Sequence, residues 1–594
     1  MEAPNSRSQR PPGHESSPGS GCGGYTRRFT LGGALVIGSA AANRIRIREW
    51  IVENFKSIEH ASTRLPPLSL LAGANSAGKS SLLQSLLLVA QSDNDSIVLN
   101  GPLVRLGLAG DVIRAGTDHC AVGAVVRARL GESQKQLSDV AFRIELKNAD
   151  GELVVHALAI YVDDEPVIEA TSRGVTTSRL EELNLGRAGG QTILRIREID
   201  GRRAPSRSYV GFGGLGPEAF IYRVQTEDRV KDLRRALRSP DRYIRMQTAI
   251  ELERQIESEE WDLPEGSPLQ NASATTIAAW TPEEIDAAIQ EIQSFIPEVE
   301  SVAVQVARTS YAIASSRRSL GYQASSPGIA KFVRALRALG IVNDTLRTIR
   351  TSARYLGPLR SEPQVVSRNV GSTRNLPVGA RGEATADHLV VQSRRTVRYA
   401  DWTGAIHADP LEIAVSKWVH YLGIGDSVTV LDQGKLGRGL RVLVDGNERD
   451  LTTIGVGASQ VLPVVALVLG ASRGDLIMIE QPELHLHPAV QSRLADFFML
   501  ARADVHLLIE THSEYLLTRL RLRIAQGRFR SRDADVLYAQ QVAGVTSIDP
   551  LSISELGDLS HWPTGFFDTQ DIDGRDLVVA VRAKLDAADN APSD

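Results

Sequence analysis

Hydrophobic and polar positions change their spacing along the chain in a way that divides the sequence into parts. Residues 45–52 alternate between apolar and polar side chains, as in a half-buried strand, and residues 68–72 form the short apolar run of a buried strand. Residues 81–88 carry leucines at helical spacing. Between residues 97 and 225, short strand-like runs such as 141–146 are separated by Gly, Asp and Asn turns. These patterns predict an α/β lobe with a β-rich segment.

From about residue 226 the pattern changes to helical spacing with many charged side chains. The stretches that share this period are 230–237, 243–256, 281–295 and 329–346. Strand-like apolar runs return near residues 475 and 506. We therefore predict that a helical lobe, residues 226–350, is inserted between two parts of one α/β domain.

A glycine-rich loop joins the predicted strand at 68–72 to the predicted helix at 81–88. Residues 73–80 read GANSAGKS, which fits the phosphate-binding pattern G-x-x-x-x-G-K-[ST]. The glycines let successive amide N–H groups turn toward phosphate oxygens, and the helix N-terminus adds partial positive charge. An ordinary glycine turn is the alternative. The pattern predicts ATP and Mg²⁺ as cofactors, with Lys79 at the β- and γ-phosphates and Ser80 on the metal. The predicted binding residues are Gly73, Ala74, Asn75, Ser76, Ala77, Gly78, Lys79, Ser80 and Ser81.

Composition narrows the class of protein. The chain has 594 residues, of which 42% are hydrophobic and 23% charged, as in ordinary globular proteins with more than one domain. The net charge of −4 argues against a uniformly basic nucleic-acid binder but allows local basic faces. Cys22 and Cys120 are too few for a disulfide framework or a cysteine metal site. We predict a cytoplasmic protein that does not span a membrane.

The first 43 residues have a different composition from the rest. Residues 3–24 are rich in Pro, Gly and Ser, which predicts a disordered tail. Arg27 and Arg28 then precede a short apolar run, which is similar to a twin-arginine export signal. A flexible tail or a translation start placed too early are the alternatives. We favour these, because an ATP-dependent protein would find no ATP outside the membrane.

A second polar constellation follows the helical lobe. Residues 475–480 form an apolar strand that ends in Glu480, and a carboxylate at such a strand end can hold the Mg²⁺ that bridges phosphates. A second apolar strand begins at His506 and ends in the sequence E-T-H-S at 510–513. Buried strands that end in acidic turns are common. The order and spacing of these segments with the loop at 73–80 nevertheless predict the second half of an ATPase.

The strings EQPELHLHP at 480–488 and THS at 511–513 resemble ABC-type ATPases of the SMC/RecF group, in particular the ATPase domains of the overcoming-lysogenization-defect (OLD) family. The resemblance covers roughly residues 44–110 and 350–545. It implies an ABC-type P-loop ATPase head, an α/β fold with a mixed sheet and flanking helices, split here by the helical lobe. The segments 355–360 and 562–568 are also similar to a bacterial subgroup with an uncharacterised C-terminal extension.

The resemblance implies roles for individual residues. Glu480 would hold Mg²⁺ through water, and His512 would contact the γ-phosphate. The signature motif would complete the site of a second subunit, so a homodimer or higher homo-oligomer is expected; its residues would be Gly457, Ala458, Ser459 and Gln460. The predicted parts are a disordered tail (1–43), an N-terminal ATPase lobe with a β-rich segment (44–225), the helical lobe (226–350), a C-terminal ATPase lobe with signature, Walker B acid and switch histidine (351–545), and a C-terminal extension (546–594).

Two positions depart from the family pattern. The signature reads V-G-A-S-Q at 456–460 instead of L-S-G-G-Q, which displaces the serine. The position after the Walker B acid, where the family has a catalytic glutamate, is Gln481. An amide cannot accept a proton as a carboxylate does, and a general base contributes about 10²–10⁴-fold to the rate. We therefore predict slow hydrolysis, with catalytic residues Glu480, Gln481 and His512. Glu483 or Glu510 could substitute, but neither occupies the expected position.

Members of the OLD family usually carry a Toprim nuclease after the ATPase. Asp571 and Asp573 spell D-x-D, but no apolar strand precedes them, so a Toprim site is not expected. Any nuclease or toxin activity is then expected on a separate effector protein. His485 and His487 have no evident third ligand, which favours a role in loop structure over metal binding.

Two functional classes remain open. The first is a DNA-associated or anti-phage defence ATPase whose nucleotide state regulates a partner effector. The alternative is the ATPase subunit of a membrane transporter, but the large insertion and the PELHLHP string favour the first. DNA is a candidate partner because arginines cluster at the start of the helical lobe, although acids follow closely and a solvated helix face is the default interpretation. These arginines are Arg229, Arg234, Arg235, Arg238, Arg242 and Arg245.

Overall fold

The computed structural model describes residues 46–93, 95–130, 137–173, 192–204, 208–258, 267, 269–270, 272–295, 299–305, 332–366, 374–563 and 569–589. The predicted tail at 1–43, with its paired arginines, lies outside these residues. Within the ranges given, no helix combines the length and the apolar character needed to span a bilayer.

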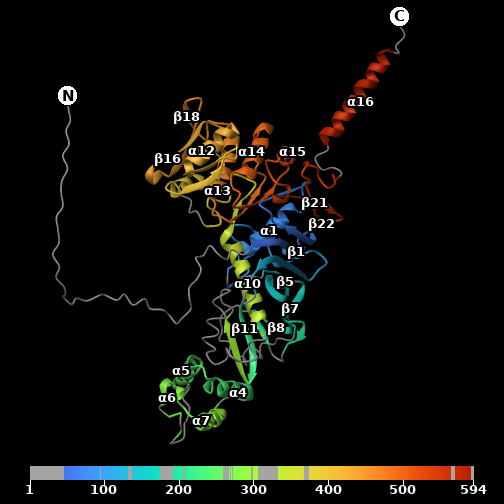
Figure 1. Ribbon diagram of the computed structural model, residues 1–594. Helices are drawn as coiled ribbons and strands as arrows, with labels where there is room; N and C mark the ends of the chain where they lie inside the picture. The colour runs from blue at the N-terminus through green and yellow to red at the C-terminus, as the bar shows by residue number, and fades with distance from the viewer. Residues whose placement is uncertain are drawn as a thin grey trace, which may run out of the picture. The chain divides into compact units, whose positions relative to one another are not determined.

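A mixed sheet of 17 strands dominates the described part of the chain (Figure 1). Its parallel core runs in the order β13 (Ala353–Leu356), β19 (Leu476–Glu480), β20 (His506–Glu510), β3 (Leu68–Gly73) and β21 (Ala534–Val542). These strands are apolar almost throughout and buried on both faces, as parallel strands usually are. Strand β20 therefore separates β3, which leads into the glycine-rich loop, from β19.

Antiparallel strands extend the sheet from β22 (Val545–Leu551), which pairs with β21 and bridges to β2 (Ile58–Arg64). Strand β1 (Arg46–Phe55) joins β2 to the β-rich segment predicted at 97–225. That segment contains β4 (His119–Ala128), β5 (Ser138–Ala149), β6 (Glu152–Val162), β7 (Glu165–Thr171), β8 (Thr192–Ile199), β9 (Arg202–Arg203), β10 (Tyr209–Gly213) and β11 (Gly216–Gln225). Alternate residues of β5 are buried, so one face of this region covers the core.

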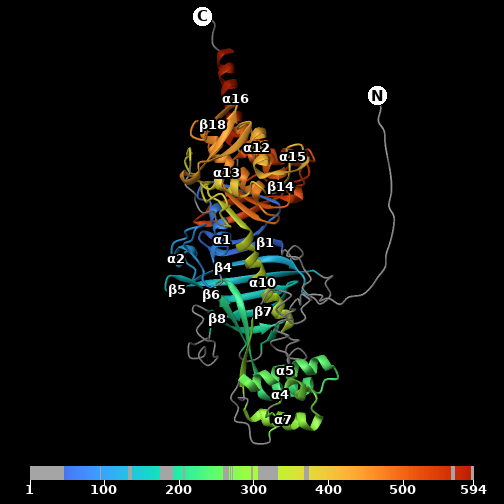
Figure 2. The same cartoon turned by 90° about the vertical axis from the view of Figure 1, so that its left-hand side faces the viewer.

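Two long helices cover the N-terminal part of the sheet. Helix α1 (Lys79–Gln91) is buried along most of its length, and Trp50 of β1 donates its indole N–H to Ser85 of this helix at 2.9 Å. Helix α10 (Val333–Ser352) lies against α1 and against β5, β6, β7 and β11 (Figure 2). The short helix α2 is Ala109–Val112.

The C-terminal helices pack around a second hydrophobic core. Trp418 and Phe497 meet edge to face at its centre, with ring centroids 5.0 Å apart. Its helices are α11 (Thr385–Val391), α12 (Leu411–Leu422), α13 (Val456–Gly470), α14 (Pro488–Leu500) and α15 (Glu514–Ala525). Beside them are the small sheets of β14 (Thr396–Ala400) with β15 (Ile406–Pro410) and of β16 (Ser427–Asp432), β17 (Arg438–Val444) and β18 (Asn447–Asp450), two 3₁₀ turns (Gly434–Leu436 and Ser531–Asp533), and helix α16 (Thr569–Asp589).

The helical lobe is inserted between two paired strands. Strand β11 leads into it, and β12 (Val299–Gln305) returns from it and pairs with β11. A hydrophobic core of its own joins α4 (Thr226–Leu237), α5 (Arg242–Ser258), α6 (Ala274–Ala278) and α7 (Pro282–Phe295). The helices that share this core, α4 to α7, cover a shorter part of the chain than the lobe predicted at 226–350.

Helix α10, which the sequence assigned to that lobe, contributes Leu339 and Val342 to the core of the main sheet. Its helical period was correct, but a period does not reveal which core an apolar face meets. Strand β22, which the sequence assigned to the C-terminal extension, pairs with β21 of the main sheet. The predicted fold class is confirmed: an α/β head with a mixed sheet, flanking helices and an inserted helical lobe.

Candidate nucleotide site

The glycine-rich loop has the backbone shape that phosphate binding requires. Gly73 ends β3 with φ of 146°, and Gly78 precedes α1 with φ of 88°. A Cβ on Gly73 would lie 2.1 Å from the carbonyl oxygen of Ala539, and one on Gly78 would lie 2.3 Å from Thr546 Oγ1. Thr546 also donates to the Ala77 carbonyl at 3.0 Å. Strands β21 and β22 therefore hold the loop from behind, and both glycines are required.

Lys79 lies within the curve of this loop. Its Nζ donates to the carbonyl oxygens of Gly73 at 3.1 Å and Ala74 at 2.7 Å, and the residue is only 4% exposed. Burial lowers the pKa of Lys79, while the nearby carboxylates of Glu510 and Glu483 act in the opposite direction. The N-terminus of α1 has no side-chain cap. A buried ammonium group beside uncapped helix amides fits nucleotide phosphates.

Glu480 and Glu510 end the neighbouring strands β19 and β20 in register. The hydroxyl of Ser80 donates to Glu510, at 2.9 Å to Oε2 and 3.2 Å to Oε1. The sequence paired Ser80 with Glu480 at the metal and considered Glu510 only as a substitute for the catalytic glutamate. The acid that contacts Ser80 is Glu510, because β20 lies between β19 and the loop strand. A metal contact of Glu480 stays a prediction.

Tyr355 and Arg360 surround Glu480 from the side of β13. The Tyr355 hydroxyl donates to Glu480 Oε1 at 2.6 Å, and Arg360 donates to the Glu480 backbone carbonyl at 3.3 Å. Burial, followed by repulsion from Glu510, raises the pKa of Glu480 to about 7. Burial also lowers the pKa of Arg360 to about 10, and its Nε and Nη1 have no hydrogen-bond partner. Sequence reasoning used the segment 355–360 only as a family likeness and missed these contacts.

Gln481 follows β19 in a strained conformation, with φ of 45°. Its backbone N–H donates to the Glu510 carbonyl at 2.8 Å, and its side chain is half-buried. Glu483 Oε1 accepts the backbone N–H of His512 at 2.6 Å, while Oε2 is buried without a partner. Burial and then the charge of Lys79 lower the pKa of His512, so its imidazole is neutral near pH 7. The predicted catalytic residues thus lie at one edge of the sheet, and their roles remain predictions.

The signature residues lie at the start of α13, but Ala458, Ser459 and Gln460 are buried. Ser459 is 6% exposed and its hydroxyl donates to the Val456 carbonyl of its own helix at 2.7 Å; Gln460 is 8% exposed. The burial of Ser459 agrees with its displacement from the family's signature position, and the role of the signature segment at a second subunit stays a prediction. Val456, 51% exposed, and the half-buried Gly457 form the accessible start of the helix. The displaced serine in the sequence was the signal of this difference.

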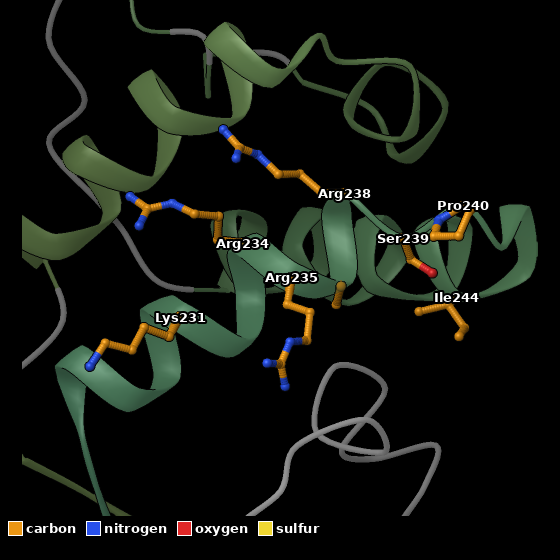
Figure 3. A pocket seen from close by; sticks show the side chains of 8 residues that line it. Lys231, Arg234, Arg235, Arg238, Ser239, Pro240 and Ile244 are labelled. Carbon is orange, nitrogen blue, oxygen red and sulfur yellow. The ribbon is translucent and has the colours of Figure 1, made fainter.

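The arginines of α4 line a pocket of about 530 Å³ in the helical lobe. Figure 3 shows Arg234 and Arg238 on one side of the helix and Arg235 on the other. Arg234 and Arg238 both pair with Asp286 of α7, at 3.0 and 2.6 Å. Lys231 and Arg235 are exposed. One of the four positive charges of the lining is thus offset by Asp286 within the lobe, and DNA contact stays a prediction.

Other candidate metal ligands are not arranged as a site. In the ranges that the structure covers, no group of three or more His, Cys, Asp or Glu side chains could hold a metal ion. His487 caps α14, where its Nδ1 accepts the Ala489 N–H at 3.2 Å, in agreement with a role in loop structure. Asp571 and Asp573 lie in helix α16 and not at a strand end. Mg²⁺ is usually held by few protein groups together with phosphate oxygens, so a nucleotide would supply its remaining ligands.

Comparison with known protein families supports the presence of an ATPase domain in this chain. Residues 409–518 match a family described as "AAA domain, putative AbiEii toxin, Type IV TA system". Residues 409–518 are therefore similar to an AAA-type ATPase domain, and the glycine-rich loop at 73–80 lies outside the matched range. Residues 530–577 match a protein family of unknown function, DUF3696, which overlaps the predicted C-terminal extension. The more specific resemblance to the OLD family stays a prediction.

Solved structures of SMC heads are similar in part. An SMC head bound to the C-terminal winged-helix domain of ScpA aligns with 86% of this chain and 98% of its own, at 11% identity and a TM-score of 0.32. The SMC head domain from Thermotoga maritima aligns with 86% of this chain and 100% of its own, at 9% identity and a TM-score of 0.30. At TM-scores this low the likeness is partial, and we infer nothing further from it.

Proposed function

We propose that this P-loop ATPase hydrolyses ATP slowly with Mg²⁺ and uses bound ATP to hold a dimer closed, which controls a separate effector protein. The observation that supports slow turnover is the position of Gln481. It directly follows the strand-end acid Glu480, and its backbone is fixed by the hydrogen bond to Glu510. A side chain held there is well placed to orient water, but an amide cannot remove the proton from it.

The surrounding residues divide the other tasks between them. Lys79 neutralises the β- and γ-phosphates, and the amides at the start of α1 donate to phosphate oxygens. The neutral imidazole of His512, held near Lys79, donates one hydrogen bond to the γ-phosphate. When bound, Mg²⁺ supplies charge neutralisation between the phosphates. This arrangement favours tight ATP binding over rapid chemistry.

Dimerisation through the start of α13 is the second part of the proposal. Val456 is an exposed apolar side chain at the N-terminus of a helix that is otherwise buried. The description of the matched family names a putative toxin of a Type IV toxin–antitoxin system, which supports a role in such a system. The exposed Lys231 and Arg235 offer a surface for DNA or another anion. No observation on the described residues favours the transporter alternative.

Molecular mass with and without nucleotide tests this function. We expect light scattering to show a larger assembly with ATP and Mg²⁺, and Val456→Arg to prevent it by placing charge at the interface. Val391→Arg, at an exposed position of α11 (70% exposed), is the matched control and should behave as wild type. Ser459→Arg is unsuitable, because a buried arginine would disturb the fold. Equal masses in all conditions would contradict the proposal.

A further inference from the structure

The metal site of this ATPase includes an acid that its sequence pattern does not assign. We propose that Glu510, at the end of β20, is the carboxylate that positions Mg²⁺ together with Ser80, and that Glu480 is held away from the metal. The proposal rests on the proposed ATP- and Mg²⁺-dependent function. Glu510 is then the residue on which the binding of Mg²⁺ depends most.

The first argument is the order of the strands. Strand β20 pairs with β3 on one side and with β19 on the other. Neighbouring strands lie about 4.8 Å apart, so the end of β19 is one strand farther from the glycine-rich loop than the end of β20. Glu480 and Glu510 are partners in register, and the distance between strands therefore makes Glu510 the nearer acid.

The second argument is the contact of Ser80. Its hydroxyl donates to both oxygens of Glu510, at 2.9 and 3.2 Å. The oxygen lone pairs of Ser80 remain available to a cation while its O–H group donates to Glu510. A carboxylate at hydrogen-bond distance from a metal-binding hydroxyl is placed to contact the metal or one of its waters.

The third argument is the environment of Glu480. Its carboxylate accepts the hydroxyl of Tyr355, which belongs to β13 on the side of β19 away from β20. Arg360 donates to the Glu480 backbone carbonyl from the same segment. One oxygen of Glu480 is thus occupied by a contact from the β13 side, whereas the Glu510 carboxylate directly accepts the hydroxyl of Ser80.

Unpaired buried polar atoms at this edge of the sheet independently indicate that it binds a charged ligand. Glu483 Oε2 and two nitrogens of Arg360 are buried without hydrogen-bond partners, in residues that are each 7% exposed. Buried polar atoms are normally paired, so these atoms are expected to gain partners when nucleotide, metal and their waters enter. Glu480, Glu483 and Glu510 are also all buried, and a divalent cation would offset their charge.

The magnesium dependence of ATP binding tests the proposal. ATP binding by the full chain is measured by calorimetry over a series of Mg²⁺ concentrations, and bound Mn²⁺ is followed by electron paramagnetic resonance. We expect Glu510→Gln to raise the half-saturating Mg²⁺ concentration about 10–100-fold, as loss of a metal-orienting group usually does. Glu480→Gln, its partner in register, should change it less than about 3-fold. Glu510→Asp should recover part of the loss and restore the Mn²⁺ signal.

ATP binding without metal separates the alternatives. The Mg²⁺ dependence of each variant is compared with that variant's own metal-free ATP affinity, so that a change in nucleotide affinity alone is not counted as a change in metal use. A larger shift in Glu480→Gln than in Glu510→Gln would overturn the proposal, as would no shift in either. A wild type that binds ATP but ignores Mg²⁺ would overturn it and leave nucleotide binding in place. A wild type that binds no ATP at any Mg²⁺ concentration would reject the proposed function as well.

Discussion

The two sides of the nucleotide site are built in different ways. The phosphate side is one continuous segment, residues 73–80, between β3 and α1. The acidic side is assembled from strand ends and turns far apart in the chain, near residues 355–360, 480–483 and 510–512. A continuous loop is specified by its own residues, whereas an edge built from separate strands depends on the order of those strands.

This difference shows where family patterns transfer and where they do not. The loop has the expected lysine and serine, and both lie where the pattern requires. At the acidic edge the pattern identified Glu480, yet the acid beside Ser80 is Glu510. Substitutions on the phosphate side should therefore affect binding itself, and those on the acidic side should affect metal use and turnover.

The largest effect is expected from Lys79→Ala, on the phosphate side. Removal of a buried charged partner costs about 2–5 kcal/mol, so ATP affinity should fall by about 30-fold to several thousand-fold. Calorimetric titration measures this change. Lys56→Ala is the control, because Lys56 is a half-buried lysine that contacts Gln84 of α1 at 2.7 Å. Wild-type affinity in Lys79→Ala would remove the basis of the site.

Gln481→Glu should give the next largest effect, on the acidic side. It introduces a carboxylate where water is activated, and steady-state phosphate release should rise on the order of 10²-fold. Gln481→Asn keeps an amide and should show no acceleration. A fast wild type that Gln481→Glu slows would mean that another group, such as Glu483, is the base.

Gly78→Ala tests how strongly the loop depends on the C-terminal strands. The positive φ costs about 1–2 kcal/mol for an alanine, and the new Cβ must displace Thr546, so we expect a loss of about 2–3 kcal/mol in unfolding free energy by urea titration. Gly116→Ala is the matched control, since Gly116 has φ of 83° and open space around it. Gly116→Ala should lose only the free energy of about 1–2 kcal/mol that the positive φ costs an alanine. In a Thr546→Ala background, Gly78→Ala and Gly116→Ala should lower the unfolding free energy by the same amount. If Gly78→Ala still costs more by the same margin, the clash with Thr546 is contradicted.

The smallest effect is a pH dependence that arises outside the site. His388 of α11 is 5% exposed, its Nε2 has no partner, and burial lowers its pKa from 6.5 to about 4. Because the folded state disfavours the charged form, this stability is complete above pH 6.5 and is lost as the pH falls toward 4. The loss between pH 7.5 and 5.5 should be about 1 kcal/mol.

His388→Gln should remove this part of the pH dependence, measured in metal-free buffer. Glu480 contributes with the opposite sign, because its raised pKa favours the protonated form in the folded state. Its contribution is present below pH 4.5 and is lost as the pH rises to about 7. The His388 effect is therefore measured as the difference in unfolding free energy between wild type and His388→Gln, and a difference that does not change between pH 7.5 and 5.5 would show that the histidine is not its source.

Much of the fold and part of the site were predictable. The alternation at 45–52 and the apolar run at 68–72 correspond to β1 and β3, and the leucines at 81–88 lie in α1. Helix α10 was assigned to the wrong body, since periodicity does not identify the partner of an apolar face. The burial of Ser459, whose hydroxyl donates to the Val456 carbonyl of its own helix, could not be predicted from the signature pattern alone.

The sequence by itself determined the glycine-rich loop, because Gly73, Gly78, Lys79 and Ser80 act through the backbone and side chains of one short segment. It also determined that the acids near 480 and 510 end apolar strands. Only the tertiary structure decided which acid meets Ser80, because that depends on β20 lying between β3 and β19. It likewise decided that Thr546 supports the loop and that Tyr355 holds Glu480, since both contacts join segments more than a hundred residues apart.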